Sequence, residues 1–332
     1  MKYIIDGHYD ILMDVAARRK KGERQVIRRR YYPAFQKGGV TGIVASIFVD
    51  SQYLPYGALS VAMEQISALH CEIEETPDLL MLCTSADDFL RAAETGKIGF
   101  LLSFEGAEPV SSCLLLHGFY AAGVRGLGRA WSRRNAAADG CDFSGSLKKG
   151  GLTEFGRELV KEAEDLHMIL DLSHLSDEGV EDVLSITSCP VIASHSNSRA
   201  VAGSNRNLTD CQMREIASRG GTVGLNGCSL LTAGPGVSPD QNGLTAHLDH
   251  MTEIMGEDHV AFGFDFCDSF FADDLSSSTD QMPERPFDIL SGAHEDLPAF
   301  LDHLRQHGYT ESHLAKLAGE NWLHTFRHIL KH

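Results

Sequence analysis

The sequence predicts an α/β fold, a (β/α)8 TIM barrel with extra C-terminal helices. Eight short, nearly continuous apolar segments recur along the chain, as expected of parallel strands covered on both faces. Helix-like segments lie between them, and this alternation favours a barrel over a doubly wound sheet. At 332 residues the chain is within the size range of one such barrel.

The eight predicted strands are rich in aliphatic and β-branched residues, which pack well on a pleated sheet. They cover residues 3–11, 41–49, 98–106, 123–131, 168–174, 190–196, 221–227 and 260–266.

Three of the intervening helices carry readable start signals. Thr153 is the expected N-cap of a helix within 152–167, and Ser176 begins the next one, with acidic residues in its first turn. A third helix, within 208–221, starts with a capping box at Thr209 and Gln212 and stops at a glycine. After the last strand, residues 297–330 predict two or three further helices packed on the outside.

The composition predicts a globular protein with a substantial core, because 43% of the residues are hydrophobic and 23% are charged. The formal net charge of −17 excludes broad binding to nucleic acid or to an anionic membrane, since both would repel the chain. No apolar run approaches the roughly eighteen residues of a membrane span. No repeat or linker divides residues 1–332, which we expect to form a single domain.

The cysteines and the start of the chain bear on its compartment. Eight cysteines are spread without a C-x-x-C pair, which indicates reduced thiols rather than disulfides or a thiolate zinc site. The chain begins without the pattern of a secretory signal. We therefore expect a cytoplasmic protein.

Residues 18–30, with the sequence RRKKGERQVIRRR, hold eight of the 29 lysines and arginines. The favoured interpretation is a solvated loop or a contact surface. The alternative is a rim that attracts anionic substrates.

Six side chains that can bind a metal lie at the C-terminal ends of the predicted strands, where such barrels carry their active sites. They are His8 and Asp10 at the end of the first strand, Glu105 of the third, His174 of the fifth, His195 of the sixth and Asp265 of the eighth. Burying several carboxylates without cations would cost many kcal/mol, so a purely structural role for all six is a poor explanation. The histidines within 294–332, by contrast, are expected on the surface.

Charge counting predicts two metal ions. Two Zn²⁺ bring four positive charges, which Asp10, Glu105, Asp265 and a bridging hydroxide neutralise. Nitrogen and oxygen ligands suit zinc best, although Mn²⁺ or Co²⁺ can substitute. Such a pair activates water near neutral pH and polarises a carbonyl, and an adjacent carboxylate moves the proton to the leaving amine. The predicted reaction is metal-assisted hydrolysis, with an amide as the favoured substrate.

The chain strongly resembles the membrane (renal) dipeptidase family of zinc peptidases, within the amidohydrolase-like barrels. The resemblance runs over nearly the whole chain and includes DGHYD, GGVTGIVASIFV, SFEGAE, GVRGLGRAW, LTEFGRELVKEAEDLHMILDLSHLS, PVIASHSNSRAV, RNLTD, GFDF and GYTESHLAKLAGENWLHTFR. Several long motifs in the same order make it specific. It implies that His8 and Asp10 bind one zinc ion and His174 and His195 the other, with Glu105 and a water or hydroxide bridging them.

The resemblance also implies two roles toward the substrate. Asp265 is expected to be the acid/base group near the bridging water and to contact the substrate. Arg206 matches the family's arginine that receives the substrate's terminal carboxylate, which a guanidinium fork binds bidentately. The alternative for Arg206 is a surface ion pair.

The chain departs from the family pattern at two places. Many members have a histidine at the end of the fourth strand that helps to stabilise the tetrahedral intermediate, and here the position holds Trp131. We expect a reshaped substrate pocket, with oxyanion stabilisation from Arg129, Arg133 or Arg134. The second departure is DFCDS in place of DFDG, which places the oxidisable thiol of Cys267 near the metals.

The leading hypothesis is therefore a dinuclear zinc dipeptidase that cleaves the peptide bond of a small dipeptide substrate. A D-residue at the C-terminal side and a homodimer are carried over from the resemblance. A metal-dependent amidohydrolase for another small amide, such as an N-acyl amino acid, is the nearer alternative. A catalytically idle metal-binding barrel is a further one, but the intact set of six polar side chains argues against it.

Overall fold

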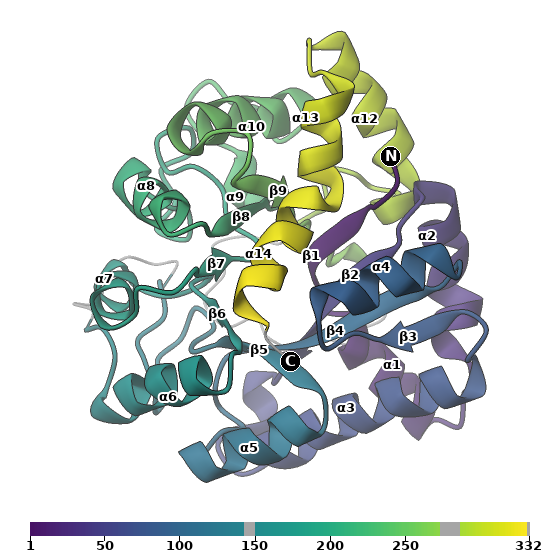
Figure 1. Ribbon diagram of the computed structural model, residues 1–332, viewed down its shortest axis with the longest axis vertical. Helices are drawn as coiled ribbons and strands as arrows, with labels where there is room; N and C mark the ends of the chain where they lie inside the picture. Colours follow the sequence, from purple (N-terminus) through teal and green to yellow (C-terminus); the bar gives the residue numbers. More distant parts are fainter. Residues whose placement is uncertain (143–149, 273–285, 331–332) are drawn as a thin grey trace.

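A parallel barrel surrounded by helices forms the body of the protein, in agreement with the predicted fold (Figure 1). The structure is a computed structural model that describes residues 1–142, 150–272 and 286–330. Eight strands follow one another in the order β1-β2-β4-β5-β6-β7-β8-β9, and β3 pairs with the start of β4. The strands are β1 (Ile5–Tyr9), β2 (Gly42–Phe48), β3 (Leu80–Leu82), β4 (Ile98–Glu105), β5 (Val124–Gly128), β6 (Ile169–Asp171), β7 (Ile192–Ala193), β8 (Thr222–Leu225) and β9 (Val260–Phe262).

The helices include several that the sequence analysis did not predict, most of them before β5. They are α1 (Ile11–Lys20), α2 (Tyr32–Gly38), α3 (Ala58–Glu75), α4 (Ala86–Glu94), α5 (Cys113–Ala121), α6 (Glu154–Asp165), α7 (Asp177–Ile186), α8 (Asp210–Ser218), α9 (Ser229–Thr232), α10 (Gln241–Met255), α11 (Asp268–Ala272), α12 (Leu297–Gln306), α13 (Glu311–Ala315) and α14 (Asn321–Ile329). Short 3₁₀ or π segments are η1 (Ile27–Tyr31), η2 (Ser51–Tyr53), η3 (Ala293–Asp296) and η4 (Lys316–Glu320).

The three predicted helix starts are confirmed. Thr153 caps α6 by accepting a hydrogen bond from the Gly156 N–H, and Ser176 caps α7 in the same way. At α8, Thr209 and Gln212 form the expected reciprocal capping box. These caps satisfy N–H groups that the first helical turn leaves without partners.

Several predicted strands are longer than the observed ones. The strand expected at 190–196 is reduced to β7, and the one expected at 123–131 ends at Gly128, so Trp131 lies in the loop that follows β5. After β5 and β7 the chain stops pairing with the neighbouring strands, because the residues that follow turn toward the mouth of the barrel. Strand β3 was not predicted, and it is only three residues long.

The barrel closes between β1 and β9 partly through a side chain. Asp6 Oδ1 accepts the Phe264 N–H at 2.9 Å and the His8 N–H at 3.3 Å. The His8 carbonyl accepts the Asp265 N–H at 3.3 Å. These contacts, which we call the seam, hold two candidate site residues in register.

The opposite, N-terminal end of the barrel is covered by α14, which lies across the centre of the strands in Figure 1. Its Trp322 packs with inward-facing residues such as Ile5 and donates its indole N–H to the Phe262 carbonyl at 2.8 Å. A Cβ on Gly7 would come within 2.4 Å of the Trp322 ring, so glycine is needed there. This end is filled, and a ligand has to enter from the other end.

The basic stretch at 18–30 makes local ion pairs. Arg18 pairs with Asp14 of α1 and Arg19 with Glu75 of α3, each with a closest N–O distance of 2.7 Å. Residues 18–20 belong to α1 and residues 27–30 to η1, so these parts of the stretch are helical and not the loop that was expected.

Two expected surface histidines are buried. His294 is 1% exposed and His313 is 8% exposed, so the surface prediction for 294–332 is wrong at both positions. The Nε2 atom of His294 lies 2.8 Å from Asp6 Oδ2. Its ring also packs edge-on against Phe266. A buried imidazole needs such a partner. His332 lies outside the described residues.

None of the helices in the described residues is long and apolar enough to cross a membrane.

Candidate metal centre

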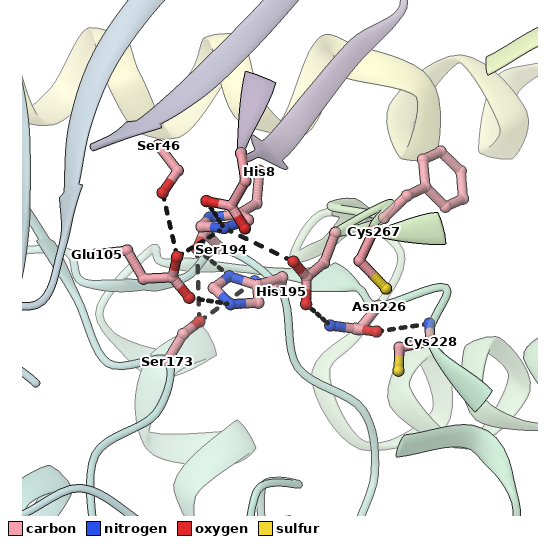
Figure 2. A network of polar contacts seen from close by, with 12 residues as sticks. His8, Ser46, Glu105, Ser173, Ser194, His195, Asn226, Cys228 and Cys267 are labelled. Carbon is pink, nitrogen blue, oxygen red and sulfur yellow. Dashed lines mark hydrogen bonds and ion pairs between the residues drawn. The ribbon is translucent and has the colours of Figure 1, made fainter. Parts of the chain in front are cut away.

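The six predicted metal-competent side chains come together at the C-terminal end of the barrel. They form overlapping clusters whose ligand-type atoms lie within 4.8 Å of one another: His8, Asp10 and Glu105; Glu105, His174 and His195; and His8, His195 and Asp265. Figure 2 shows Glu105 facing His8 and His195 across the centre.

Glu105 belongs to two clusters through different oxygens. Its Oε2 lies 3.5 Å from His8 Nε2, whereas its Oε1 lies 2.8 Å from His174 Nε2 and 3.6 Å from His195 Nε2. Ser46 donates a hydrogen bond to Oε2 at 3.1 Å and fixes the carboxylate plane. One carboxylate that serves two ligand groups can bridge two metal ions.

Backbone geometry places these side chains. His8 is on β1, and Asp10 is the N-cap residue of α1, just beyond the strand. His174 and Asp265 lie past their strands, with φ of 67° and 58°, a region that residues with a side chain rarely adopt. Such strain typically persists where function requires a particular side-chain direction.

Two buried polar atoms of the cluster have no hydrogen-bond partner among the residues that the structure describes. These are His8 Nε2 and Asp10 Oδ1, which lie 3.7 Å apart. An orphaned buried acceptor is costly, and a cation held between the two would satisfy both. The nitrogen and oxygen donors present fit zinc or a similar divalent metal.

The carboxylates packed around His8 shift the pKa values of the first ligand group. Burial disfavours the imidazolium of His8, but the Glu105 and Asp10 carboxylates outweigh it and raise its pKa well above the usual value. Burial, together with the Glu105 charge, raises the pKa of Asp10. Although burial opposes it, the neighbouring histidines hold the pKa of Glu105 well below its ordinary range.

His174 and His195, in the second ligand group, are neutral. Burial, with a contribution from the Arg206 cation, lowers the pKa of His174 to about 4. Burial also lowers the pKa of His195 well below its usual value, with further contributions from His8 and Arg206. A neutral imidazole is the form that ligates a metal.

Hydrogen bonds orient these two imidazoles. The Ser132 hydroxyl lies 2.8 Å from His174 Nδ1, and the Ser194 hydroxyl lies 2.7 Å from His195 Nδ1. Ser194 in turn donates to Asp171 Oδ2 at 2.5 Å. A proton on Nδ1 leaves Nε2 free to face the cluster centre, which is how protein metal sites fix the tautomer.

Asp265 is held by Asn226, whose side-chain N–H donates to Asp265 Oδ2 at 2.9 Å (Figure 2). Its other oxygen lies 3.8 Å from His8 Nε2. Burial and the charges of Asp10 and Glu105 raise the pKa of Asp265 well above its usual value, although His8 opposes them. A carboxyl with a raised pKa suits proton transfer.

Arg206 is 3% exposed, so the surface ion pair considered as its alternative does not occur. Its Nη1 donates to the Ser196 hydroxyl and its Nη2 to the His195 carbonyl, both at 2.7 Å. Its Nε is buried and has no acceptor within the described part of the chain. A guanidinium carries five N–H donors, so Arg206 retains donors for a ligand.

Trp131 lines the same mouth. Its ring stacks on His174 with centroids 5.7 Å apart and also contacts Phe48. Of the arginines expected nearby, Arg129 is fully buried and donates to the carbonyls of Leu127 and Asp171, and Arg134 pairs with Asp139. The guanidinium of Arg133 lies 5.3 Å from the Trp131 ring centroid.

The Cys267 thiol lies near Cys228 (Figure 2), and the charge of Asp265 also acts on it. A hydrogen bond to Cys228 and burial raise the pKa of the Cys267 thiol well above its usual value. Cys267, Asp268 and Asp288 also form a ligand-type group, but Asp288 accepts the backbone N–H groups of the other two. Those bonds account for the group without a metal.

The sequence analysis missed the residues that support the site. Asp6 and Asp171 precede the predicted ligands by two or three positions in their strands, and Asn226 lies near the end of the predicted strand at 221–227. Polar residues inside otherwise apolar predicted strands are the signal that could have identified these three. No local pattern identifies His294, which reaches Asp6 from 288 positions away.

Comparisons with known proteins show the family to which the chain belongs. The model of the membrane dipeptidase family (peptidase family M19) matches residues 2–331. The chain is 33% identical over 283 residues to an uncharacterised protein in the pqqA 5′ region of Klebsiella pneumoniae, a match that covers 83% of this chain and 98% of that protein.

Two crystal structures are similar along almost the whole chain. The dipeptidase AC, a metallopeptidase of family M19, superposes with a TM-score of 0.84 at 29% identity and covers 99% of both chains. A metallopeptidase from Rhodobacter sphaeroides, liganded with a phosphinate mimic of the dipeptide L-Ala-D-Ala, has a TM-score of 0.83 at 29% identity. That match covers 98% of this chain and 99% of the other.

Proposed function

Because the chain belongs to the membrane dipeptidase family (peptidase family M19) and is a metal-dependent hydrolase of that family, we propose that it is a dinuclear zinc dipeptidase. The observation that carries the proposal is Glu105, whose two oxygens face two separate ligand groups. His8 and Asp10 would hold one metal ion and His174 and His195 the other. When bound, the metals supply a water of lowered pKa and a Lewis acid for the scissile carbonyl.

The chain's own residues then bind the substrate and move the proton. Arg206 receives the terminal carboxylate through donors that its protein partners leave free. Asp265, anchored by Asn226, takes a proton from the attacking water and passes it to the leaving amine. Trp131 forms the wall beside His174 and limits the shape of the acyl half of the substrate.

The relative bound to a mimic of L-Ala-D-Ala supports small dipeptides, including those with a C-terminal D-residue, as substrates. A second candidate, hydrolysis of another small amide such as an N-acyl amino acid, is favoured by Trp131. Its indole offers one N–H and a large apolar face where many family members have an imidazole. We also propose that residues 1–332 act as one domain, that the protein is cytoplasmic, in keeping with its eight free cysteines, and that it forms a homodimer.

The test is amino-acid release, measured by mass spectrometry, from a mixed library of L,L- and L,D-dipeptides and N-acyl amino acids. The zinc-loaded protein is compared with a chelated sample. We expect chelator-sensitive cleavage of dipeptides. Cleavage of the N-acyl compounds alone would move the assignment to the second candidate.

A matched pair of variants tests the bridging residue. Glu105→Gln keeps the shape of the side chain but removes its charge, and it is expected to lower turnover by more than about 100-fold. This loss exceeds the usual effect of removing a residue that only orients a metal ligand. Glu253→Gln, at an exposed position of α10, is the control. Full activity of Glu105→Gln, with two metals still bound, would contradict a bridging role.

A further inference from the structure

We propose that Arg133 forms a second anion-binding subsite beside the metal centre, and that the preferred substrate carries a carboxylate on its acyl half as well as at its C-terminus. The inference rests on the proposed function and narrows its substrate class. It points to dipeptides with an acidic N-terminal residue, or to N-acyl amino acids whose acyl group is a dicarboxylate.

Arg133 lies at the mouth of the barrel, next to the wall of the site. Its guanidinium carbon is 5.3 Å from the centroid of Trp131 and 5.6 Å from that of Phe48, the last residue of β2. Trp131 stacks in turn on His174. The guanidinium is therefore one aromatic ring away from a candidate metal ligand.

The guanidinium is fixed in place, yet most of its donors are unused. Its Nη2 donates to the Val49 carbonyl at 2.7 Å and lies 2.9 Å from Glu108 Oε1. Its Nε and Nη1 are buried, and neither has an acceptor among the residues that the structure describes. A buried donor without an acceptor costs about 1–3 kcal/mol, and more when it is charged. A carboxylate from a ligand would remove that cost.

The neighbouring arginines do not combine unused guanidinium donors with a position at the mouth. Arg129 Nε also lacks an acceptor, but the side chain is fully buried and closed to a ligand. The Arg134 side chain is 74% exposed and pairs with Asp139. Arg133 retains 15% of its side-chain surface at the mouth, and a ligand there would have to turn the guanidinium to reach the covered Nε and Nη1.

The barrel order places the two guanidiniums on opposite sides of a metal ligand. Arg133 follows β5, His174 follows β6, and Arg206 contacts the residues after β7. Two extended residues span about 7 Å, so a dipeptide held at Arg206 directs its N-terminal side chain away from that residue, past His174. An acidic side chain there meets Arg133.

The first test needs no turnover. Binding of L-Glu and of its neutral isostere L-Gln to the zinc-loaded protein is measured by calorimetry. Each amino acid is the product that hydrolysis releases from the N-terminal half of a dipeptide. We expect L-Glu to bind at least ten-fold more tightly. Arg133→Met should abolish the difference, whereas Arg134→Met, at the exposed neighbouring position, should preserve it. Equal affinities in the wild type, or an unchanged ratio in Arg133→Met, would overturn the subsite.

The second test compares kcat/KM for Glu-Ala and Gln-Ala. We expect at least a ten-fold preference for Glu-Ala, reduced toward one in Arg133→Met and partly kept in Arg133→Lys, which retains the charge without the planar fork. If Gln-Ala is cleaved as well as Glu-Ala, the subsite is wrong while the dipeptidase proposal stands. If neither dipeptide nor any library member is cleaved, the proposed function is wrong. The ratio of the L-Glu and L-Gln affinities then remains as the test of the Arg133 subsite.

Discussion

At the scale of single residues, the site depends on polar side chains that orient the ligands rather than on the ligands alone. His195 shows this best, because its Nδ1 faces the Ser194 hydroxyl, which itself donates to Asp171. The carboxylate orients the hydroxyl so that its oxygen accepts the imidazole proton. The ring is thereby locked with Nε2 toward Glu105.

We expect Ser194→Ala to weaken zinc binding about 10- to 100-fold, the usual effect of losing an outer partner of a ligand. The imidazole would lose its acceptor and could rotate or change tautomer. Zinc affinity is measured by competition with a coloured chelator, with Ser218→Ala on the exposed face of α8 as the control. Equal zinc affinities for Ser194→Ala and the wild type would show that packing alone orients the ring.

At the scale of elements, the sequence could predict which segments are strands but not where the ladder ends. Strand identity follows from apolar runs, which are local. Ladder length depends on where the chain must turn, and His174 and Asp265 turn early with positive φ. The predicted strands at 168–174 and 260–266 therefore extend past β6 and β9, although the side chains at their ends were placed at the correct end of the barrel.

The seam between β1 and β9 yields a prediction for an element. His294, in η3, holds Asp6, and Asp6 holds the backbone N–H groups of His8 and Phe264. We expect His294→Gln to lower the free energy of unfolding by about 1–3 kcal/mol and to reduce zinc content, because a buried acceptor loses its partner and β1 shifts against β9.

Denaturant unfolding and metal analysis measure the two effects in parallel. His303→Gln serves as the control, since His303 is a partly buried histidine of α12 that contacts Thr245 outside the seam. Loss of stability with full zinc content would reduce the seam to a purely structural feature. Unchanged stability and zinc content would contradict the role of His294 altogether.

At the scale of the whole molecule, the long-range contacts are what the sequence could not predict. Barrel class follows from repeated local patterns, and the candidate ligands follow from the rule that strand ends meet at one mouth. The burial of His294 depends instead on a contact with Asp6, 288 positions away. The contacts of Arg206 span only ten or eleven positions, but no sequence pattern indicates them. Only the folded chain shows that Arg206, expected to face substrate, is also tied to Ser196 and the carbonyl of His195.

Acid sensitivity of the whole fold provides the last prediction. His247 of α10 is fully buried; its Nδ1 accepts the Ser198 N–H at 3.1 Å, and its Nε2 lies 3.2 Å from the Thr232 carbonyl. Burial lowers the pKa of His247 to about 4, although the bond to Thr232 opposes the shift. The neutral ring therefore joins the segment after β7 to α9 and α10.

Because the unfolded chain binds this proton near pH 6.5 and the folded chain only near pH 4, acid favours unfolding. The stabilisation is complete above pH 6.5 and is lost as the pH falls toward 4, by about 1.4 kcal/mol per pH unit for this one group. We expect His247→Gln to be less stable at pH 7 and to lose less stability on acidification. Urea midpoints of the metal-free proteins between pH 7 and pH 5 measure both. If the stability of the variant changed with pH as steeply as that of the wild type, His247 would already be protonated in the folded state. That result would contradict the hydrogen bond that its Nδ1 accepts from the Ser198 N–H.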